Sequence, residues 1–278
     1  MNEDAEKQTF YRHENRKMKI AVVQTNPVTG DIEGNLRRAD ALISACPGAD
    51  VYVLPEMFST GFVMNPADVA EPSAGPSLLW MREKAKELNA AVCGSVATAV
   101  ELCTLVNRMY FVEPDGTTTV YDKRHLFSFA GENQSYAPGD KRVVVTFREA
   151  RFLLEVCYDV RFPVWSRCTG DYDVALYVAS WPVKRRRAWD ILLQARAIEN
   201  QCFVAASNRV GEDDSGIAYN GGSVVLNPFG EPLTSAPEEE EGVAVAELDL
   251  EWMKNYRQKF PALADRDHFH IEQDILQQ

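Results

Sequence analysis

Phe152-Leu-Leu-Glu-Val-Cys-Tyr-Asp-Val-Arg-Phe-Pro163 predicts a buried strand that ends at a cysteine. A short apolar run such as 152–156 is typical of a strand that is covered on both faces. The residues after Cys157 are polar or charged, and Pro163 then fixes its own φ and removes a backbone donor. The sequence therefore places Cys157 where a strand gives way to a loop or helix.

A cysteine in this position is, taken alone, most often a small buried core residue. Two other apolar strands change that interpretation, because Val53-Leu-Pro-Glu56 ends in a carboxylate and the segment from Tyr121 reaches Lys123. A thiol nucleophile needs a base that takes its proton, and a tetrahedral intermediate needs a cation or N–H donors. Since α/β sheets bind ligands at the carboxyl ends of strands, we expect these three groups to share one site.

The three residues lie in motifs that resemble those of the Glu–Lys–Cys triad of the nitrilase superfamily of carbon–nitrogen hydrolases. The motifs are Leu54-Pro-Glu-Met-Phe58, Asp122-Lys-Arg-His-Leu-Phe127 and Val156-Cys-Tyr-Asp-Val-Arg-Phe-Pro163. The likeness runs from about Met18 to the C-terminal segment. Three further segments are similar to the omega-amidase branch of that superfamily: Arg124-His-Leu-Phe127, Ala195-Arg-Ala-Ile-Glu-Asn-Gln-Cys202 and Ser207-Asn-Arg-Val-Gly211.

The 278 residues fit a single α/β domain. Apolar runs predict strands over 18–24, 51–54, 91–97, 105–112, 118–121, 143–147, 152–156, 174–178, 203–207, 223–227 and 243–248. Helices are expected over 35–45, 76–89, 185–201 and 251–258, whereas 128–140 is too irregular for an element. Several neighbouring strands lack a helix between them, so the sheets are mixed. The resemblance implies a four-layer α-β-β-α sandwich.

The two ends of the chain show less hydrophobic periodicity than the rest. Residues 1–17 are polar and are expected to form a mobile extension, which leaves 18–278 as the hydrolase domain. The tail carries apolar residues that we expect to dock on another surface, such as a partner subunit: Phe260, Leu263, Phe269 and Ile271. The resemblance implies dimers that pack through their helices.

Composition excludes several classes of function. The net charge of −12 argues against binding to nucleic acid or to an anionic membrane surface. No apolar run approaches the roughly 20 residues of a membrane-spanning helix. The six cysteines form no C-x-x-C pair, and no histidine cluster has metal-ligand spacing, so we expect reduced thiols, a cytoplasmic protein and neither metal nor cofactor. Cys93, Cys103 and Cys202 are expected in the core, and Cys46 and Cys168 stay open.

The resemblance assigns a role to each catalytic candidate. Glu56 is the general base, and Lys123 stabilises the oxyanion and lowers the thiol pKa. The backbone N–H of Tyr158, next to the nucleophile, is the second oxyanion donor. Many family members carry a second glutamate in the loop after the lysine, and Glu132 matches it, holding Lys123 in place.

Binding residues are less determined by pattern. Arg161 is expected to form an ion pair with Glu155 or Asp159 that braces the turn, rather than to contact substrate. Trp181 fits a pocket wall and a packed core indole equally well. The basic run 184–187 fits a solvated helix start, with attraction of an anionic substrate as the alternative.

The expected chemistry is covalent hydrolysis of an amide through a Cys157 thioester. The branch resemblance implies ω-amides of short dicarboxylic 2-oxo acids, such as 2-oxoglutaramate. Nitriles, carbamoyl amines and simple aliphatic amides stay open on the same triad, as does a catalytically silent binding subunit. A substrate carboxylate needs a cation besides Lys123; the candidates are Arg161, Lys184, Arg185 and Arg196.

Overall fold

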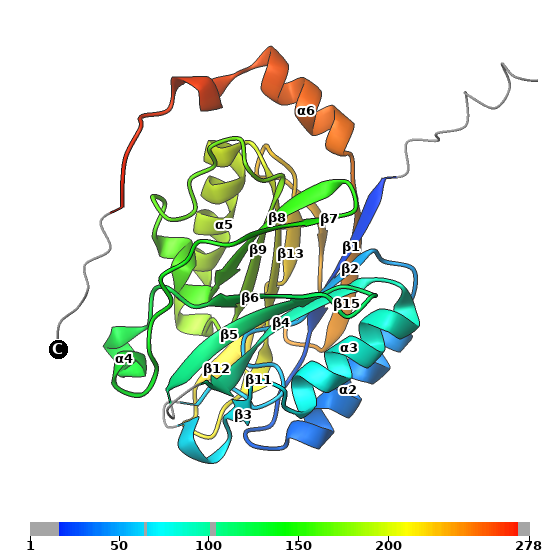
Figure 1. Ribbon diagram of the computed structural model, residues 1–278, viewed down its shortest axis with the longest axis vertical. Helices are drawn as coiled ribbons and strands as arrows, with labels where there is room; N and C mark the ends of the chain where they lie inside the picture. The colour runs from blue at the N-terminus through cyan, green and yellow to red at the C-terminus, as the bar shows by residue number, and fades with distance from the viewer. Residues whose placement is uncertain (1–16, 64–65, 101–103, 272–278) are drawn as a thin grey trace, which may run out of the picture.

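The computed structural model describes residues 17–63, 66–100 and 104–271, and shows two β-sheets packed face to face between layers of helices (Figure 1). The first sheet contains β1 Met18–Gln24, β2 Val51–Val53, β3 Glu71–Pro72, β4 Ala91–Ala99, β5 Leu105–Val112, β6 Thr118–Asp122 and β15 Gly242–Leu248. Its order is β15-β1-β2-β4-β5-β6, with β3 beside β4. In this sheet β1, β2 and β4 run parallel, and the remaining pairs except β3–β4 are antiparallel.

The second sheet contains β7 Val144–Phe147, β8 Ala150–Val156, β9 Val174–Ala179, β10 Phe203–Asn208, β13 Val224–Leu226 and β14 Pro232–Ser235. Its order is β14-β13-β10-β9-β8-β7, with a parallel centre of β8, β9 and β10 and antiparallel edges. A small hairpin of β11 Val210–Glu212 and β12 Ala218–Asn220 follows β10. Both main sheets are therefore mixed, as the sequence predicts.

The helices complete the layers. They are α2 Ile32–Ser44, α3 Pro76–Leu88, the single turn α4 Glu132–Ser135, α5 Arg186–Asn200 and α6 Leu250–Lys259. Ile43 of α2 and Met81 of α3 are buried in one core with Tyr52 of the first sheet. Trp189 and Leu193 of α5 belong to the core of the second sheet.

Between the sheets, the ring of Phe111 in β5 lies 5.5 Å from that of Phe152 in β8 and 5.9 Å from that of Phe147 in β7. These apolar contacts bury the inner faces of both sheets, and the predicted four-layer sandwich is confirmed.

The differences from the predicted elements have local causes. Helix α2 begins at Ile32 instead of 35, because the Asp31 side chain accepts a hydrogen bond from the Gly34 N–H and caps it. The segment 128–140 does contain elements, the 3₁₀ turn Ser128–Ala130 and α4, each too short to show a period. The hairpin strands β11 and β12 are three residues each and were not predicted for the same reason.

Other predictions concern single residues. In the tail, Leu263 and Ile271 pack against the core of their own chain, whereas Phe260 and Phe269 are exposed. Among the cysteines that the structure describes, all are free, Cys46 is partly exposed and the others are buried. Cys103 and residues 1–16 lie outside the described residues. No described helix has the length and apolar character that crossing a membrane requires.

One carboxyl group lies inside the second sheet without a hydrogen-bond partner. Glu155 of β8 is fully buried, and neither of its oxygens has a partner among the described residues. Burial raises the pKa of Glu155 well above its ordinary value, and the charge of Asp159 raises it further. The charges of Arg142 and Arg196 lower this pKa, but by less than burial and Asp159 raise it. Within a window of pH the folded chain therefore keeps a proton that the unfolded chain has lost, so stability falls as the pH rises.

Glu155→Gln should make the chain more stable, and the gain should grow with pH. Below the unfolded pKa of about 4.3 both states hold the proton and no pH-dependent difference is expected. As the pH rises toward the folded pKa, wild type should lose up to about 1.4 kcal/mol per pH unit relative to the variant. Urea denaturation between about pH 5 and about pH 8 measures the free energy of unfolding.

Glu247→Gln, at an exposed position of β15, is the matched control and should show no such trend. A Glu155→Gln variant that differs from wild type by the same amount at every pH would contradict the assignment of a neutral Glu155.

Candidate active site

Cys157 occupies a strained backbone turn at the end of β8. It begins the 3₁₀ turn Cys157–Arg161 with φ of 49°, in the left-handed region that costs a non-glycine residue about 1–3 kcal/mol. The turn is held because the Asp159 carboxylate accepts a hydrogen bond of 2.9 Å from the Val156 N–H. Only 9% of Cys157 is exposed, and the residue lines a pocket.

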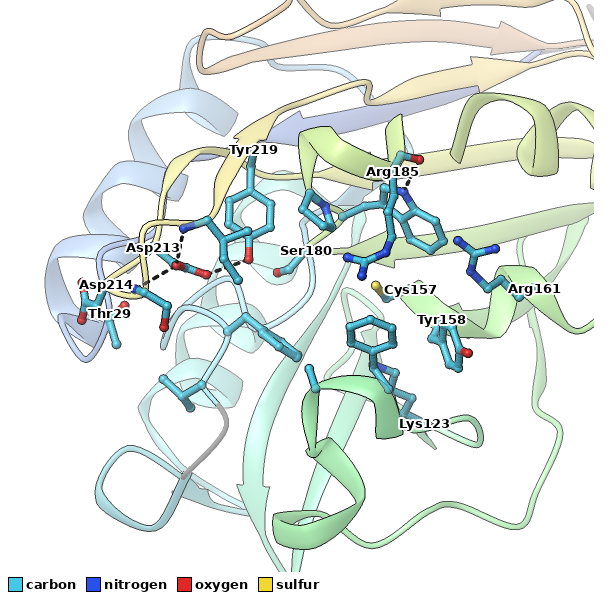
Figure 2. Close-up of a pocket in the computed structure, with 18 residues that line it drawn as sticks. Thr29, Lys123, Cys157, Tyr158, Arg161, Ser180, Arg185, Asp213, Asp214 and Tyr219 are labelled. Carbon is cyan, nitrogen blue, oxygen red and sulfur yellow. Dashed lines mark hydrogen bonds between the residues drawn. The ribbon is translucent and has the colours of Figure 1, made fainter. Parts of the chain in front are cut away.

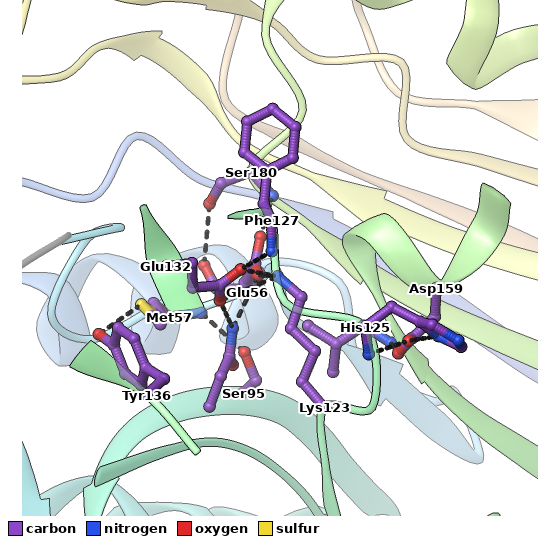
Figure 3. Close-up of polar contacts among 12 residues, drawn as sticks. Glu56, Met57, Ser95, Lys123, His125, Phe127, Glu132, Tyr136, Asp159 and Ser180 are labelled. Atoms are coloured by element: carbon purple, nitrogen blue, oxygen red, sulfur yellow. Dashed lines mark hydrogen bonds and ion pairs between the residues drawn. The ribbon is translucent and has the colours of Figure 1, made fainter. Parts of the chain in front are cut away.

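Glu56 follows β2 and is fully buried beside the pocket (Figure 3). Its Oε1 accepts hydrogen bonds from Lys123 Nζ and from Asn107 Nδ2, each 2.8 Å long. Its Oε2 accepts one from the backbone N–H of Ser180, also 2.8 Å long. Groups in β5 and just after β6 and β9, from both sheets, therefore fix the orientation of this carboxylate.

Lys123 lies after β6 between two carboxylates. Besides Glu56, its Nζ donates to both oxygens of Glu132, at 3.0 and 2.9 Å. Glu132 is itself held by the N–H of Phe127, 2.6 Å from Oε2. Burial on its own would lower the pKa of Lys123, but the charges of Glu132 and Glu56 outweigh it and raise that pKa well above its ordinary value. Lys123 is thus a permanent cation.

The Cys157 thiol is protonated in this environment. Burial raises the pKa of Cys157, and the charge of Glu56 raises it further, while Lys123 lowers it. Lys123 thus lowers the thiol pKa as predicted, but burial and Glu56 outweigh it and the net pKa of Cys157 lies well above its ordinary value. The main reason is burial of the thiol, to which the negative charge of Glu56 adds. A protonated thiol can act as a nucleophile only if a base takes its proton during attack, and the Glu56 carboxylate lies close enough to affect the pKa of this thiol.

Arg161 does not brace the turn as predicted. Among the described residues it forms no ion pair. Tyr121, His125 and the Val156 N–H occupy the oxygens of Asp159, and Glu155 is fully buried within β8. Its guanidinium lies 4.9 Å from the ring centroid of Trp181 and lines the pocket (Figure 2).

The basic run at the start of α5 divides between solvent and pocket. Lys184 and Arg187 are exposed, as predicted for a solvated face. Arg185 instead lines the pocket, with its guanidinium 5.2 Å from the Phe127 ring and 5.3 Å from the Phe129 ring. Arg196 is directed elsewhere, since it donates to the carbonyl of Val160 at 2.7 Å.

Trp181 combines both of its predicted roles. Its indole lines the pocket, packs 5.3 Å from the Trp189 ring and donates a 2.9 Å hydrogen bond to the carbonyl of Arg185. Tyr158, also in the pocket wall, occupies the second position of the 3₁₀ turn. Backbone N–H groups in the first turn of a helix have no intrahelical acceptor, which leaves that of Tyr158 available to a ligand.

The pocket has a volume of about 480 Å³ and contains residues that were not predicted. Opposite the arginines, the loop of the β11–β12 hairpin contributes Asp213, Asp214 and Ile217 (Figure 2). Asn107 and Ser180, which hold Glu56, were also missed. A signal for Asn107 existed, because it is a polar residue inside the apolar strand β5. No group of three or more potential metal ligands occurs among the described residues.

Comparisons with known proteins show which family the chain is similar to. A family model described as carbon-nitrogen hydrolase matches residues 19–258, a range that contains every pocket residue named above. The chain is 48% identical to Omega-amidase YafV of Yersinia enterocolitica, over 91% of this chain and 98% of that protein. It is 32% identical to the 2-oxoglutaramate amidase of Bacillus subtilis, over 90% and 97% of the two chains. A solved CN-hydrolase superfamily protein of Xanthomonas campestris with an arsenic adduct in its active site matches with a TM-score of 0.89 at 40% identity, covering 92% of this chain and 99% of that one.

Proposed function

The chain belongs to the carbon–nitrogen hydrolase family and hydrolyses non-peptide carbon–nitrogen bonds, and we propose that Cys157, Glu56 and Lys123 carry out this reaction as a catalytic triad. It is an omega-amidase that converts the ω-amide of short dicarboxylic 2-oxo acids, of the 2-oxoglutaramate type, to the acid and ammonia. The observation that supports the triad is the convergence of a neutral thiol, a buried carboxylate and a permanent cation at one pocket.

In the first half of the reaction, Cys157 Sγ attacks the amide carbon while Glu56 takes the thiol proton. The carbonyl π electrons move to oxygen, and the resulting oxyanion is stabilised by Lys123 Nζ and the Tyr158 N–H. When the carbonyl re-forms, the C–N bond breaks and the nitrogen takes the proton from Glu56, which releases ammonia and leaves a thioester.

In the second half, water attacks the thioester carbon and gives a proton to Glu56. The C–S bond then breaks, the acid leaves, and the sulfur recovers its proton from Glu56. Glu132 acts on Lys123, whose Nζ it holds with both oxygens, so that the ammonium stays beside the reacting carbonyl.

Cys157→Ala should abolish ammonia release from 2-oxoglutaramate with little change in melting temperature, because one small buried group replaces another. Lys123→Ala should lower kcat by at least the ~10²–10³-fold of a lost oxyanion donor. Glu56→Gln should also prevent turnover, yet its thiol should alkylate at lower pH than that of wild type, since the charge that raises the Cys157 pKa is gone.

Mass spectrometry after iodoacetamide treatment identifies the alkylated cysteine, with Cys157→Ala as the blank. Full activity in Cys157→Ala would refute the nucleophile. If wild type acts on nitriles or carbamoyl amines but not on 2-oxoglutaramate, its substrates belong to one of those classes instead. A wild type that is inert to all three would favour a catalytically silent binding subunit.

The substrate carboxylate is bound by the pocket arginines. Arg161 and Arg185 are half-buried, line the pocket with Cys157 and have no carboxylate partner among the described residues. A carboxylate that leaves water must find charged or N–H partners, and an arginine provides both. Of the predicted candidates, Lys184 and Arg196 do not line the pocket.

Arg161→Met and Arg185→Met should lower kcat/KM on 2-oxoglutaramate and spare a neutral amide of the same length. Loss of a charge-assisted contact of ~1.5–3 kcal/mol corresponds to roughly 10–150-fold. Lys184→Met, next to Arg185 but outside the pocket, is the matched control. If wild type cleaves the neutral amide as fast as 2-oxoglutaramate, carboxylate recognition is absent and the protein is a general aliphatic amidase.

A homodimer through the helices of the second sheet is supported by exposed apolar groups in the single chain. Ile191 and Ile198, seven residues apart on one face of α5, are each more than half exposed. Trp252 of α6 is also partly exposed and stacks in an aromatic group with Tyr256.

The unpaired described cysteines support a reducing, cytoplasmic location, which fractionation of the source cells would test.

Sedimentation velocity should show wild type as a dimer at micromolar concentration. Ile198→Lys should shift it toward monomer, because a charge would be buried in the interface. Leu79→Lys, at an exposed position of α3 on the first sheet, should leave the dimer intact. A monomeric wild type would rule out this assembly.

A further inference from the structure

One buried carboxylate connects the segment that carries Lys123 to the turn that carries Cys157. Oδ1 of Asp159 accepts a 3.0 Å hydrogen bond from the backbone N–H of His125, and the Nδ1 of the same ring lies 2.7 Å away (Figure 3). Oδ2 accepts from the Tyr121 hydroxyl at 2.8 Å and from the Val156 N–H. Tyr121 and His125 flank Lys123 on either side, just as Val156 and Asp159 flank Cys157.

The imidazole of His125 is held in one orientation. It stacks on the Phe162 ring, with centroids 3.7 Å apart and planes 5° from parallel. The Trp165 ring lies edge-on to it at 5.9 Å, and the Trp165 Nε1 donates to the Tyr121 hydroxyl at 3.1 Å. The side chain is 21% exposed, so small molecules in solution can reach the ring.

This connection crosses between the two sheets. Lys123 follows β6 of the first sheet, and Cys157 follows β8 of the second, so no backbone hydrogen bond of either sheet sets the distance between them. A misplacement of about 1 Å can cost about 10²-fold in rate. The left-handed backbone of Cys157 also persists only if its surroundings hold it.

We propose that His125 is a positioning residue, which acts through Asp159 to hold Lys123 in register with the Cys157 turn. It touches neither substrate nor the reacting atoms. Its ring N–H fixes the Asp159 carboxylate, the carboxylate fixes the turn, and the oxyanion formed at Cys157 then develops beside Lys123. The inference rests on the proposed chemistry of Cys157 and Lys123.

The test compares His125→Ala, His125→Asn and His125→Gln on 2-oxoglutaramate. An asparagine amide can place an N–H near the position of Nδ1, whereas a glutamine amide reaches the position of Nε2. We expect His125→Ala and His125→Gln to lower kcat by about 10–100-fold with KM changed less than about threefold. His125→Asn should recover most of kcat, and added imidazole should partly restore His125→Ala. His268→Ala, at an exposed position, is the control and should not respond to imidazole.

The outcomes separate the possibilities. Activity of His125→Ala within about twofold of wild type would overturn the proposal. So would equal losses in all three variants that follow their melting temperatures and are not rescued by imidazole, because this result describes a purely structural residue. If wild type itself releases no ammonia from any amide, the proposed function has failed, and unchanged alkylation of Cys157 in His125→Ala would then overturn the positioning role independently.

Discussion

The site depends on two buried carboxylates that share one ammonium group. Glu56, Glu132 and Lys123 are almost without solvent exposure, and ionised groups in such a place are costly unless every partner is present. The first sheet supplies Lys123 and Asn107, and the second supplies Ser180, whose N–H completes the shell of Glu56. Burial, together with the negative charge of Glu56, also keeps the neighbouring thiol protonated.

Much of this arrangement could be predicted from sequence, because a strand end is a local pattern. Apolar runs that stop at Glu56, Lys123 and Cys157 indicate three groups at the edges of sheets. In the structure Lys123 and Cys157 line one pocket, and Glu56 is hydrogen-bonded to Lys123. The four-layer fold was implied by the resemblance to the nitrilase superfamily, since hydrophobic periodicity alone predicted only mixed sheets. The direction of Arg161 could not be predicted. It depends on which groups occupy Asp159, and two of the three, Tyr121 and His125, are more than thirty positions away.

The distribution of charge around the pocket also could not be predicted from the sequence. A net charge of −12 gives no indication of a pocket wall that carries two arginines over aromatic rings. The hairpin at Asp213 was missed because three-residue strands carry no period. Asn107 is visible as a polar residue in an apolar strand, but its partners Glu56 and Glu132 come from other segments of the chain. Charge counts describe the surface, whereas the local field of a concave site depends on a few side chains.

The division of the site between two sheets has a consequence for biogenesis. A nascent or partly folded chain with only one sheet formed would hold Cys157 apart from Glu56 and Lys123, and such a thiol has the ordinary reactivity of a cysteine. Hydrolytic activity requires that the two sheets pack against each other and exclude water from their inner faces. Assembly of the core is therefore the step that creates the site, because residues of both sheets contribute to it.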